Sequence, residues 1–400
     1  MTGWNSVKEQ IGREARKAGF DLCGIAPAAH FAELEYFPGW IAEGRHGEMN
    51  YLAARTGDQK LKRASLANTA PWARSVVVCA LNYDSPHPYS TECTDPLRGW
   101  ISRYAWAEVD YHDTVLKRLR GLESSAIALA AQQPGAPPLR TWCYVDTGPV
   151  VERVLARYAG IGWVGKNTCI IHQQLGSWLF LGVLLTSLPL PPDLPAPDRC
   201  GSCTRCLDAC PTGALPHAYQ MDASRCISYL TIEKRGSIPI DLRAGIGRNI
   251  FGCDICQDVC PWNRRGDGTE LPEARPPETM QHPERQQLLP LPERDPIREL
   301  AARDDLVNPE LHCLAAISKE KFSSTFRHSP VKRARYEGLL RNIIIAMGNS
   351  GDVSFIPELE TFARSENPVL SEHARWSLGI LRSARKAAKP RLGSSNAVDT

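Results

Sequence analysis

Two runs of cysteines carry the strongest chemical signal in the sequence. Residues 200–211 read C-G-S-C-T-R-C-L-D-A-C-P, which is the C-x2-C-x2-C-x3-C-P spacing of bacterial ferredoxins. Residues 253–261 read C-D-I-C-Q-D-V-C-P, and the leading cysteine that this second run lacks is supplied upstream by Cys226. Three thiolates on one tight loop can bind three irons of a cubane, and the fourth ligand must come from elsewhere. The spacing therefore predicts a ferredoxin-like domain with two [4Fe-4S] clusters.

Ligation is expected to cross between the runs, because in two-cluster ferredoxins the cysteine before proline binds the other cluster. The expected ligands are Cys200, Cys203, Cys206 and Cys260 for one cluster and Cys210, Cys226, Cys253 and Cys256 for the other. Zinc ribbons and disulfides are competing interpretations, but zinc sites usually use pairs of cysteines. The remaining cysteines are scattered, and we expect them to be small buried residues.

Length, composition and charge limit what can surround these cysteines. The chain has 400 residues, 43% hydrophobic and 23% charged, which is typical of a globular protein with two or three domains. Its net charge of +3 restricts any nucleic-acid binding to a local patch. The N-terminus lacks a secretory signal, and the longest apolar run, residues 178–185, is too short to span a membrane. We therefore expect a cytoplasmic monomer whose clustered cysteines bind metal.

Helical and strand signals alternate over residues 1–188, which predicts an α/β domain. Some segments repeat apolar residues with helical spacing, and others are short, apolar and rich in β-branched residues. The expected helices cover residues 5–18 and 111–131, and the expected strands cover residues 75–81, 139–145 and 179–188. Gly148 and Pro149 are expected to open a further helix.

Asp146 lies between the expected strand at 139–145 and that further helix. This would place it at the carboxyl edge of the sheet, where ligands bind in α/β proteins. Its carboxyl group could donate a proton if burial raises its pKa, or it could only cap the helix. The spacing alone leaves both roles open.

The rest of the chain divides by composition. We expect a ferredoxin-like domain at 189–263, a proline-rich crossing at 264–297, a helical region at 298–388 and a tail at 389–400. Residues 342–348 resemble residues 374–379, which suggests HEAT-like repeats, although an ordinary helical cap would look similar. Removal of everything after Pro330 is expected to leave the clusters in place.

A glycine-rich loop follows the expected α/β elements. Residues 160–167 read G-I-G-W-V-G-K-N. Such a loop can bring its backbone close to a bulky cofactor, or it can form only a tight turn. Neither a dinucleotide fingerprint nor a P-loop accompanies it.

Taken together, these motifs resemble those of epoxyqueuosine reductases. The order is Asp-x-Gly-Pro-x-x-Glu-Arg from residue 146, Gly-Ile-Gly-Trp-x-Gly-Lys-Asn from 160, Gly-Ser-Trp-x-Phe-Leu-Gly from 176, and then the double cysteine set. Further matches are Ser-Arg-Tyr-Ala from 102, Asp-Tyr-His from 110 and Ser-Tyr-Leu-Thr-Ile-Glu-Lys-Arg-Gly from 228. The resemblance covers nearly the whole chain.

The resemblance implies a specific reaction. Such enzymes reduce the epoxide of epoxyqueuosine to the cyclopentene of queuosine at the wobble base of a tRNA anticodon, the last step of queuosine biosynthesis. They carry base-off cob(II)alamin and two [4Fe-4S] clusters, and they take electrons from an external low-potential donor such as a flavodoxin or ferredoxin. Asp110-Tyr-His112 lacks the glycine of the signature for histidine-ligated cobalamin, which fits a family without a protein histidine on cobalt.

The resemblance also assigns residues. Asp146 matches the proposed proton donor, and the expected cobalamin contacts are Arg63, Lys166 and Asn167. The expected tRNA-binding residues are Lys332, Arg333, Arg335 and Arg341, within a run of basic residues that could otherwise be a solvated helix face. Two alternatives remain, a reductive dehalogenase-like cobalamin enzyme and an iron–sulfur electron carrier.

Overall fold

The computed structural model describes residues 3–133, 139–263 and 298–388. The expected proline-rich crossing and tail lie outside these residues. Within the described ranges, no helix combines the length and the apolar composition needed to cross a membrane.

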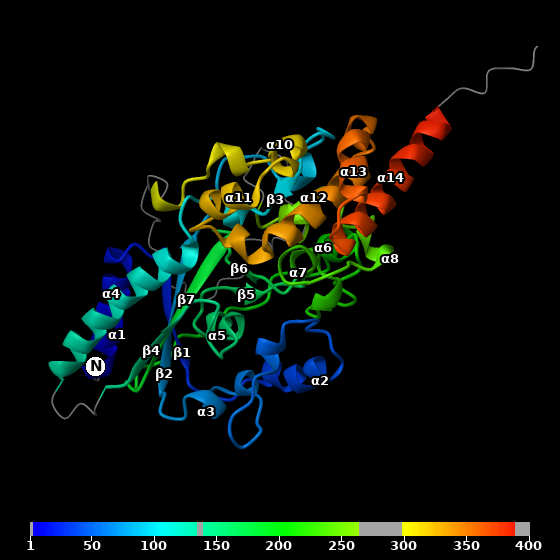
Figure 1. Ribbon diagram of the computed structural model, residues 1–400. Coiled ribbons are helices and arrows are strands. Elements are labelled where there is room, and N and C mark those ends of the chain that lie inside the picture. Colours follow the sequence, from blue (N-terminus) through cyan, green and yellow to red (C-terminus); the bar gives the residue numbers. More distant parts are fainter. Residues whose placement is uncertain (1–2, 134–138, 264–297, 389–400) are drawn as a thin grey trace, which may run out of the picture.

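A four-stranded antiparallel sheet organises the N-terminal part of the chain (Figure 1). Its order is β1 (Leu22–Pro27), β2 (Ser75–Asn82), β7 (Leu179–Thr186) and β4 (Thr141–Tyr144). Helices cover both faces, so β2 is buried along nearly its whole length. On one face lie α1 (Gly3–Lys17) and α4 (Tyr111–Ala131), and on the other lies α5 (Glu152–Tyr158).

The predicted alternation of helices and strands is confirmed, but two details differ. Every neighbouring pair in the sheet is antiparallel, so successive strands end at opposite edges and the parallel-sheet rule does not apply to Asp146. The helix expected at Gly148 begins only at Glu152, with Val151 at its N-cap. Asp146 is therefore not a helix cap, and it lies in the loop after β4 instead.

Short elements lie outside the sheet. Between β1 and β2 these are α2 (Tyr36–Ala42) and α3 (Leu66–Thr69). The glycine-rich loop lies in a small hairpin of β5 (Trp163–Val164) and β6 (Ile170–Ile171). In the cysteine region, α6 (Arg205–Asp208) packs against α9 (Ile255–Asp258), one helix from each run. Between them in the chain come α7 (Ile227–Ile232), α8 (Ile240–Arg243) and β8 (Asn249–Phe251).

The C-terminal part is helical, as expected. It contains α10 (Leu311–Ala315), α11 (Lys319–Thr325), α12 (Tyr336–Ser350), α13 (Ile356–Ala363) and α14 (Pro368–Ala388). The last helix packs on both α12 and α13, at the end of the molecule opposite the N-terminus (Figure 1). The HEAT-like repeat stays a prediction.

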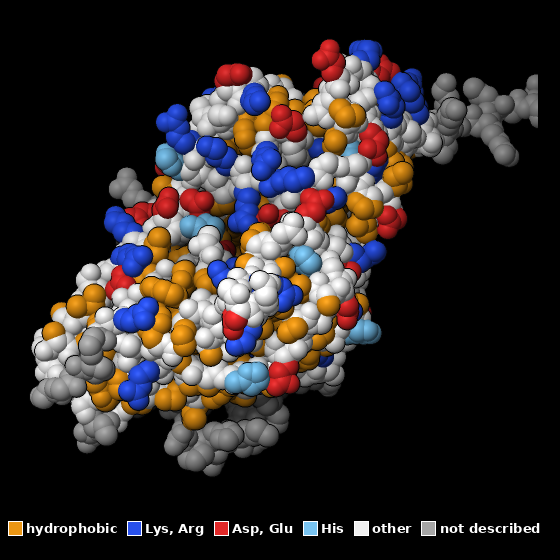
Figure 2. All heavy atoms as spheres, turned by 60° about the horizontal axis from the view of Figure 1, so that its bottom comes forward, with side chains coloured by type: hydrophobic (Ala, Val, Ile, Leu, Met, Phe, Trp, Pro, Cys, Tyr) orange, Lys and Arg blue, Asp and Glu red, His pale blue; other side chains and the backbone are white. Residues whose placement is uncertain are grey.

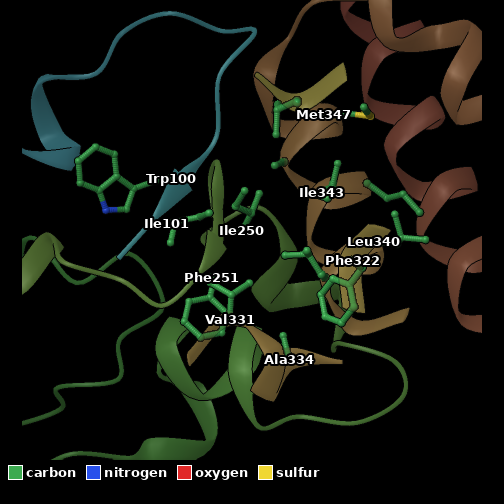
Figure 3. Close-up of a cluster of buried hydrophobic side chains, with 14 of the residues drawn as sticks. Trp100, Ile101, Ile250, Phe251, Phe322, Val331, Ala334, Leu340, Ile343 and Met347 are labelled. Carbon is green, nitrogen blue, oxygen red and sulfur yellow. The ribbon is translucent and has the colours of Figure 1, made fainter. Parts of the chain in front are cut away.

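One hydrophobic core joins all three parts of the chain (Figure 3). Strand β3 (Trp100–Ile101) pairs in parallel with β8 from the cysteine region, and α12 packs on this pair. Phe251 of β8 contributes to the same core as Ile343 and Met347 of α12. The expectation that residues after Pro330 are dispensable for the cluster region stays a prediction, and the shared core argues against it, because truncation would remove side chains that pack beside the second cysteine run.

Candidate active site

A cavity of about 660 Å³ lies where the three parts of the chain meet. Its walls come from the sheet edge at which β2 and β4 end, from the cysteine region, and from the segment before α12. The lining residues that carry the argument below are Tyr111, His112, Asp146, Glu152, Lys332 and Arg333.

Asp146 projects from a left-handed turn at this sheet edge. Its φ of 56° is a conformation that aspartate tolerates better than most residues. Tyr111, the first residue of α4, donates a hydrogen bond from its hydroxyl to Asp146 Oδ2, and His112 Nε2 lies 3.6 Å from the same oxygen. The Asp146 side chain is 56% exposed, so protein atoms alone do not supply the desolvation that the sequence led us to expect.

Glu152 is a second acid beside Asp146. Burial and the neighbouring Asp146 charge raise the pKa of Glu152 to about 8, although the backbone N–H of Asp146 donates a hydrogen bond to its carboxyl group. Its environment therefore favours the protonated form of Glu152. Two acidic side chains thus lie side by side, Asp146 in the loop after β4 and Glu152 at the start of α5.

The cysteines form two groups. In the outer cysteine group (Cys200, Cys203, Cys206 and Cys260), burial and the nearby Cys200 and Cys203 raise the pKa of Cys206 to about 11. Burial and then Cys200 and Cys206 raise the pKa of Cys260 to about 12, against an opposing backbone hydrogen bond from Trp262. These mutual effects require that the thiols of both runs lie close together.

The inner cysteine group consists of Cys210, Cys226, Cys253 and Cys256. Burial raises the pKa of Cys253, and the neighbouring Cys226 and Cys210 add to the effect. All four residues line the cavity, whereas none of the outer group does. Among the described residues, no set of three or more His, Cys, Asp or Glu side chains is arranged around a single metal ion.

Cys169 is a further cavity cysteine. Its thiol is hydrogen-bonded to that of Cys256, which lowers the pKa of Cys169 to about 7. Of the cysteines that we expected to be buried, Cys79 and Cys143 are, but Cys313 is exposed.

Only one of the three expected cobalamin contacts lines the cavity. Asn167 does, and its Nδ2 donates to the carbonyl oxygen of Cys256 at 3.1 Å. Lys166 instead donates to the carbonyl oxygens of Gly201 and Cys203, so its ammonium group supports the first cysteine run.

Arg63 also has a structural role. It is buried, and it donates to the carbonyl oxygens of Tyr51 and Gly148 at 2.7 Å each. It therefore binds the backbone of the loop that follows Asp146, and it does not line the cavity, so its expected contact with cobalamin stays a prediction.

The four expected tRNA-binding residues separate in the structure. Lys332 and Arg333 are exposed and line the cavity, while Arg335 is exposed but outside it. Arg341 is 2% exposed and donates to the carbonyl oxygens of Leu230, Lys234 and Gly236. Its assignment to a tRNA surface is wrong, because its guanidinium group is enclosed by another segment of the chain.

Arg333 holds the C-terminal part against the cavity mouth. Its Nε lies 2.5 Å from Glu233 Oε1, and its Nη2 donates to the Tyr51 hydroxyl at 3.3 Å. On the face of the molecule drawn in Figure 2, Lys and Arg side chains are more numerous over the C-terminal helices than over the sheet. Apolar side chains predominate on the half formed by the sheet.

Comparison with known proteins identifies the family. A family model described as epoxyqueuosine reductase QueG, DUF1730, matches residues 63–147, and one described as a 4Fe-4S double cluster binding domain matches residues 199–263. An epoxyqueuosine reductase from Xanthomonas campestris pv. campestris is 37% identical, over 91% of this chain and 93% of its own length. The chain belongs to the epoxyqueuosine reductase family. It is therefore an oxidoreductase of tRNA modification that reduces epoxyqueuosine and contains a 4Fe-4S binding domain.

Solved epoxyqueuosine reductases share this fold. One was crystallised with an epoxyqueuosine-modified stem loop of tyrosine tRNA; it is 31% identical, with a TM-score of 0.74 over 97% of this chain and 96% of its own. Another, from Bacillus subtilis, has its catalytic aspartate loop swung out of the active site; it is 30% identical, with a TM-score of 0.72 and the same coverage.

Sequence reasoning missed several residues of this epoxyqueuosine reductase site. Tyr111 and His112 were visible only as part of a family motif, and nothing local linked them to Asp146, which follows Tyr111 by 35 residues. Glu152 also belonged to a quoted motif, but its burial depends on the fold. Cys169 lies outside both cysteine runs, so spacing gave it no role.

Proposed function

We propose that this chain reduces the epoxide of epoxyqueuosine at the tRNA wobble position, with cobalamin bound in the cavity between Asp146 and two [4Fe-4S] clusters. The observation that carries the proposal is that Asp146 and all four inner cysteines line the same cavity. A proton donor and an electron source therefore face one compartment, which is what a reductive deoxygenation needs.

Two clusters are supported by the grouping of the thiols. Each group contains three cysteines from one part of the chain and one from the other run, as the crossed ferredoxin pattern requires. Four cysteines can also bind zinc or a [2Fe-2S] cluster, but the crossed spacing is that of two [4Fe-4S] clusters, and the family model matched over residues 199–263 supports this. The outer cluster would receive electrons from an external low-potential donor of the flavodoxin or ferredoxin class, and the inner cluster would pass them into the cavity.

The cavity residues fit a cobalamin that has no histidine on cobalt. His112 is the one histidine of the described chain that lines the cavity, and its Nδ1 is engaged by Asp110 Oδ1 at 2.6 Å while Nε2 faces Asp146. Asn167 offers a polar side chain on the wall next to Cys256. When bound, cobalamin supplies a strongly reducing cobalt centre that accepts electrons one at a time.

Asp146 would deliver a proton to the epoxide oxygen. Tyr111 fixes the position of its carboxyl group, since the Tyr111 ring is itself stacked between Phe180 and His112 with ring centroids 4.1 Å apart on each side. The half-exposed carboxyl group faces the space where the modified base would enter. The Bacillus subtilis relative, whose catalytic loop also carries an aspartate, supports this role.

The tRNA would approach from the C-terminal side of the cavity. Lys332 and Arg333 lie at its mouth, and phosphate contacts from such side chains position RNA. The relative solved with a modified stem loop supports this approach. We further propose that the C-terminal helices are HEAT-like, and that the enzyme acts as a monomer in the cytoplasm, where its tRNA substrate is found.

The direct experiment is nucleoside analysis of epoxyqueuosine-containing tRNA after incubation with the reduced, reconstituted enzyme. Queuosine should appear, and Asp146→Asn should slow its formation about 100- to 10,000-fold, because asparagine cannot deliver a proton. Cobalamin content, iron content and tRNA affinity should stay close to the wild type.

A matched control is Asp113→Asn, which changes an exposed acid in the first turn of α4. It should leave the rate unchanged. A wild-type enzyme that forms no queuosine, or an Asp146→Asn variant that keeps the wild-type rate, would contradict the proposal.

A further inference from the structure

The proposed reaction requires more protons than Asp146 can carry. Conversion of an epoxide to an alkene breaks both carbon–oxygen bonds, forms one carbon–carbon π bond, and consumes two electrons and two protons, with the oxygen leaving as water. The electrons come from the low-potential donor through the clusters. Both protons must reach the same oxygen atom, yet a carboxyl group delivers one proton at a time. Either a second group delivers the other proton, or Asp146 is reprotonated within each turnover.

The structure places an imidazole beside Asp146. His112 Nε2 lies 3.6 Å from Asp146 Oδ2, a separation that a small side-chain rotation converts to a hydrogen bond. This nitrogen is buried and has no hydrogen-bond partner among the described residues. An unpaired polar atom in such a position calls for an explanation, because buried polar groups are normally hydrogen-bonded.

His112 is held in place from two other directions. Asp110 Oδ1 accepts a hydrogen bond from the His112 backbone N–H at 3.0 Å and lies 2.6 Å from Nδ1. The His112 ring also stacks on Tyr111, whose hydroxyl donates to Asp146. One carboxylate thus orients the imidazole at Nδ1, which leaves Nε2 to face the second carboxylate.

From this geometry we infer that His112 is a positioning residue that returns a proton to Asp146 between the two protonations of the epoxide oxygen. The His112 side chain is 25% exposed, so solvent reaches its ring although Nε2 itself is buried. The inference rests on the proposed function, and it adds the proton path which that reaction needs.

Glu152 is the competing proton source. Its carboxyl group lines the cavity, and burial raises its pKa to about 8. It accepts a hydrogen bond from the backbone N–H of Asp146, however, and so faces the main chain. The His112 ring instead approaches the Asp146 carboxyl oxygen itself, which is the atom that must regain the proton.

The test compares His112→Gln with the wild type in the reconstituted holoenzyme. We expect kcat to fall roughly 10- to 100-fold, less than the loss from Asp146→Asn, because solvent can still reprotonate Asp146 slowly. The KM for tRNA, the cobalamin content and the iron content should not change. Added imidazole should restore much of the His112→Gln rate but none of the Asp146→Asn rate, a result that a purely structural role for His112 would not give.

Two further variants sharpen the result. Asp110→Asn should lower kcat in the same direction, because it removes the carboxylate that orients the imidazole. His30→Gln is the matched control, since His30 is an exposed histidine paired with Glu35, and it should behave as the wild type.

The inference is overturned if His112→Gln keeps the wild-type kcat, if imidazole does not rescue its loss, or if Glu152→Gln shows the imidazole-rescued loss instead. Each of these outcomes would contradict only the role of His112, because the wild type would still form queuosine. Absence of queuosine with the wild type would contradict the proposed function itself.

Discussion

The inner and outer cysteine groups have the same donor chemistry but different surroundings. The inner group lines the cavity together with Asp146. The outer group packs with Trp163, Ile171 and Trp262, next to the exposed residues Gly201 and Arg205. Ligand identity therefore does not distinguish the two proposed clusters, whereas position does. This difference supports the proposed direction of electron flow, from the surface through the outer group to the inner group and the cavity.

The strongest test of this difference between the inner and outer groups is removal of the inner cluster. Cys226→Ala deletes a ligand that comes from neither cysteine run and that packs beside Ile227 and Leu230. We expect iron to fall from about eight to about four atoms per chain and queuosine formation to stop, because electrons can no longer reach the cavity. Iron analysis and a turnover assay check this. Full turnover with half the iron would place the electron path elsewhere.

The outer cluster should be less essential. Cys260→Ala should remove the cluster built on Cys200, Cys203 and Cys206, since ligation crosses between the runs. Turnover driven by a protein donor should be lost, whereas a small strong reductant should still support a single turnover through the inner cluster. Electron paramagnetic resonance spectra of the two cysteine variants should show different remaining clusters. If Cys260→Ala instead loses the cluster on Cys253 and Cys256, the pairing is wrong.

A fall in pH should destabilise the region around the outer cysteine group first. This effect should be smaller than those of the two cysteine substitutions. Burial lowers the pKa of His172 to about 4, and its Nδ1 accepts the backbone N–H groups of Gln174 and Leu175. Below about pH 6.5 the unfolded chain binds a proton at this histidine that the folded protein does not bind until about pH 4, so stability falls as pH falls through that window.

The measurement is the melting temperature at pH 7 and pH 5. The wild type should lose a few degrees more than His172→Gln, and absorbance from the outer cluster should decrease before that from the inner one, because Ile171 packs against Cys260. Equal pH dependence of the two proteins would exclude this role for His172.

Local sequence patterns predicted local structure well. The helix over residues 111–131 and the strand beginning at Ser75 are both present, since their periodicity and end signals lie within the segments themselves. The cysteine spacing predicted a domain with 4Fe-4S binding, which the family model supports, whereas the assignment of individual cysteines to each cluster stays a prediction.

Features that depend on distant segments could not be predicted. Arg341 looked like a surface charge, but carbonyl groups more than 100 residues away satisfy its guanidinium group. Asp146 looked like part of a parallel-sheet edge, because alternation of helices and strands does not reveal strand direction. The approach of His112 to Asp146 arises from the packing of α4 against the sheet, which no local pattern encodes.

The parallel pairing of β3 with β8 has a consequence for biosynthesis. The Trp100 indole donates to Asp254 at 2.9 Å, and these two residues are 154 positions apart in the chain. At about 5 to 20 residues per second, a ribosome needs roughly 8 to 30 seconds to synthesise the intervening polypeptide. The nascent chain thus carries strand β3 unpaired throughout this interval, and contacts of such high sequence separation form slowly. We therefore expect loading of the inner cluster to begin only after the second cysteine run, which contains Asp254, has been synthesised.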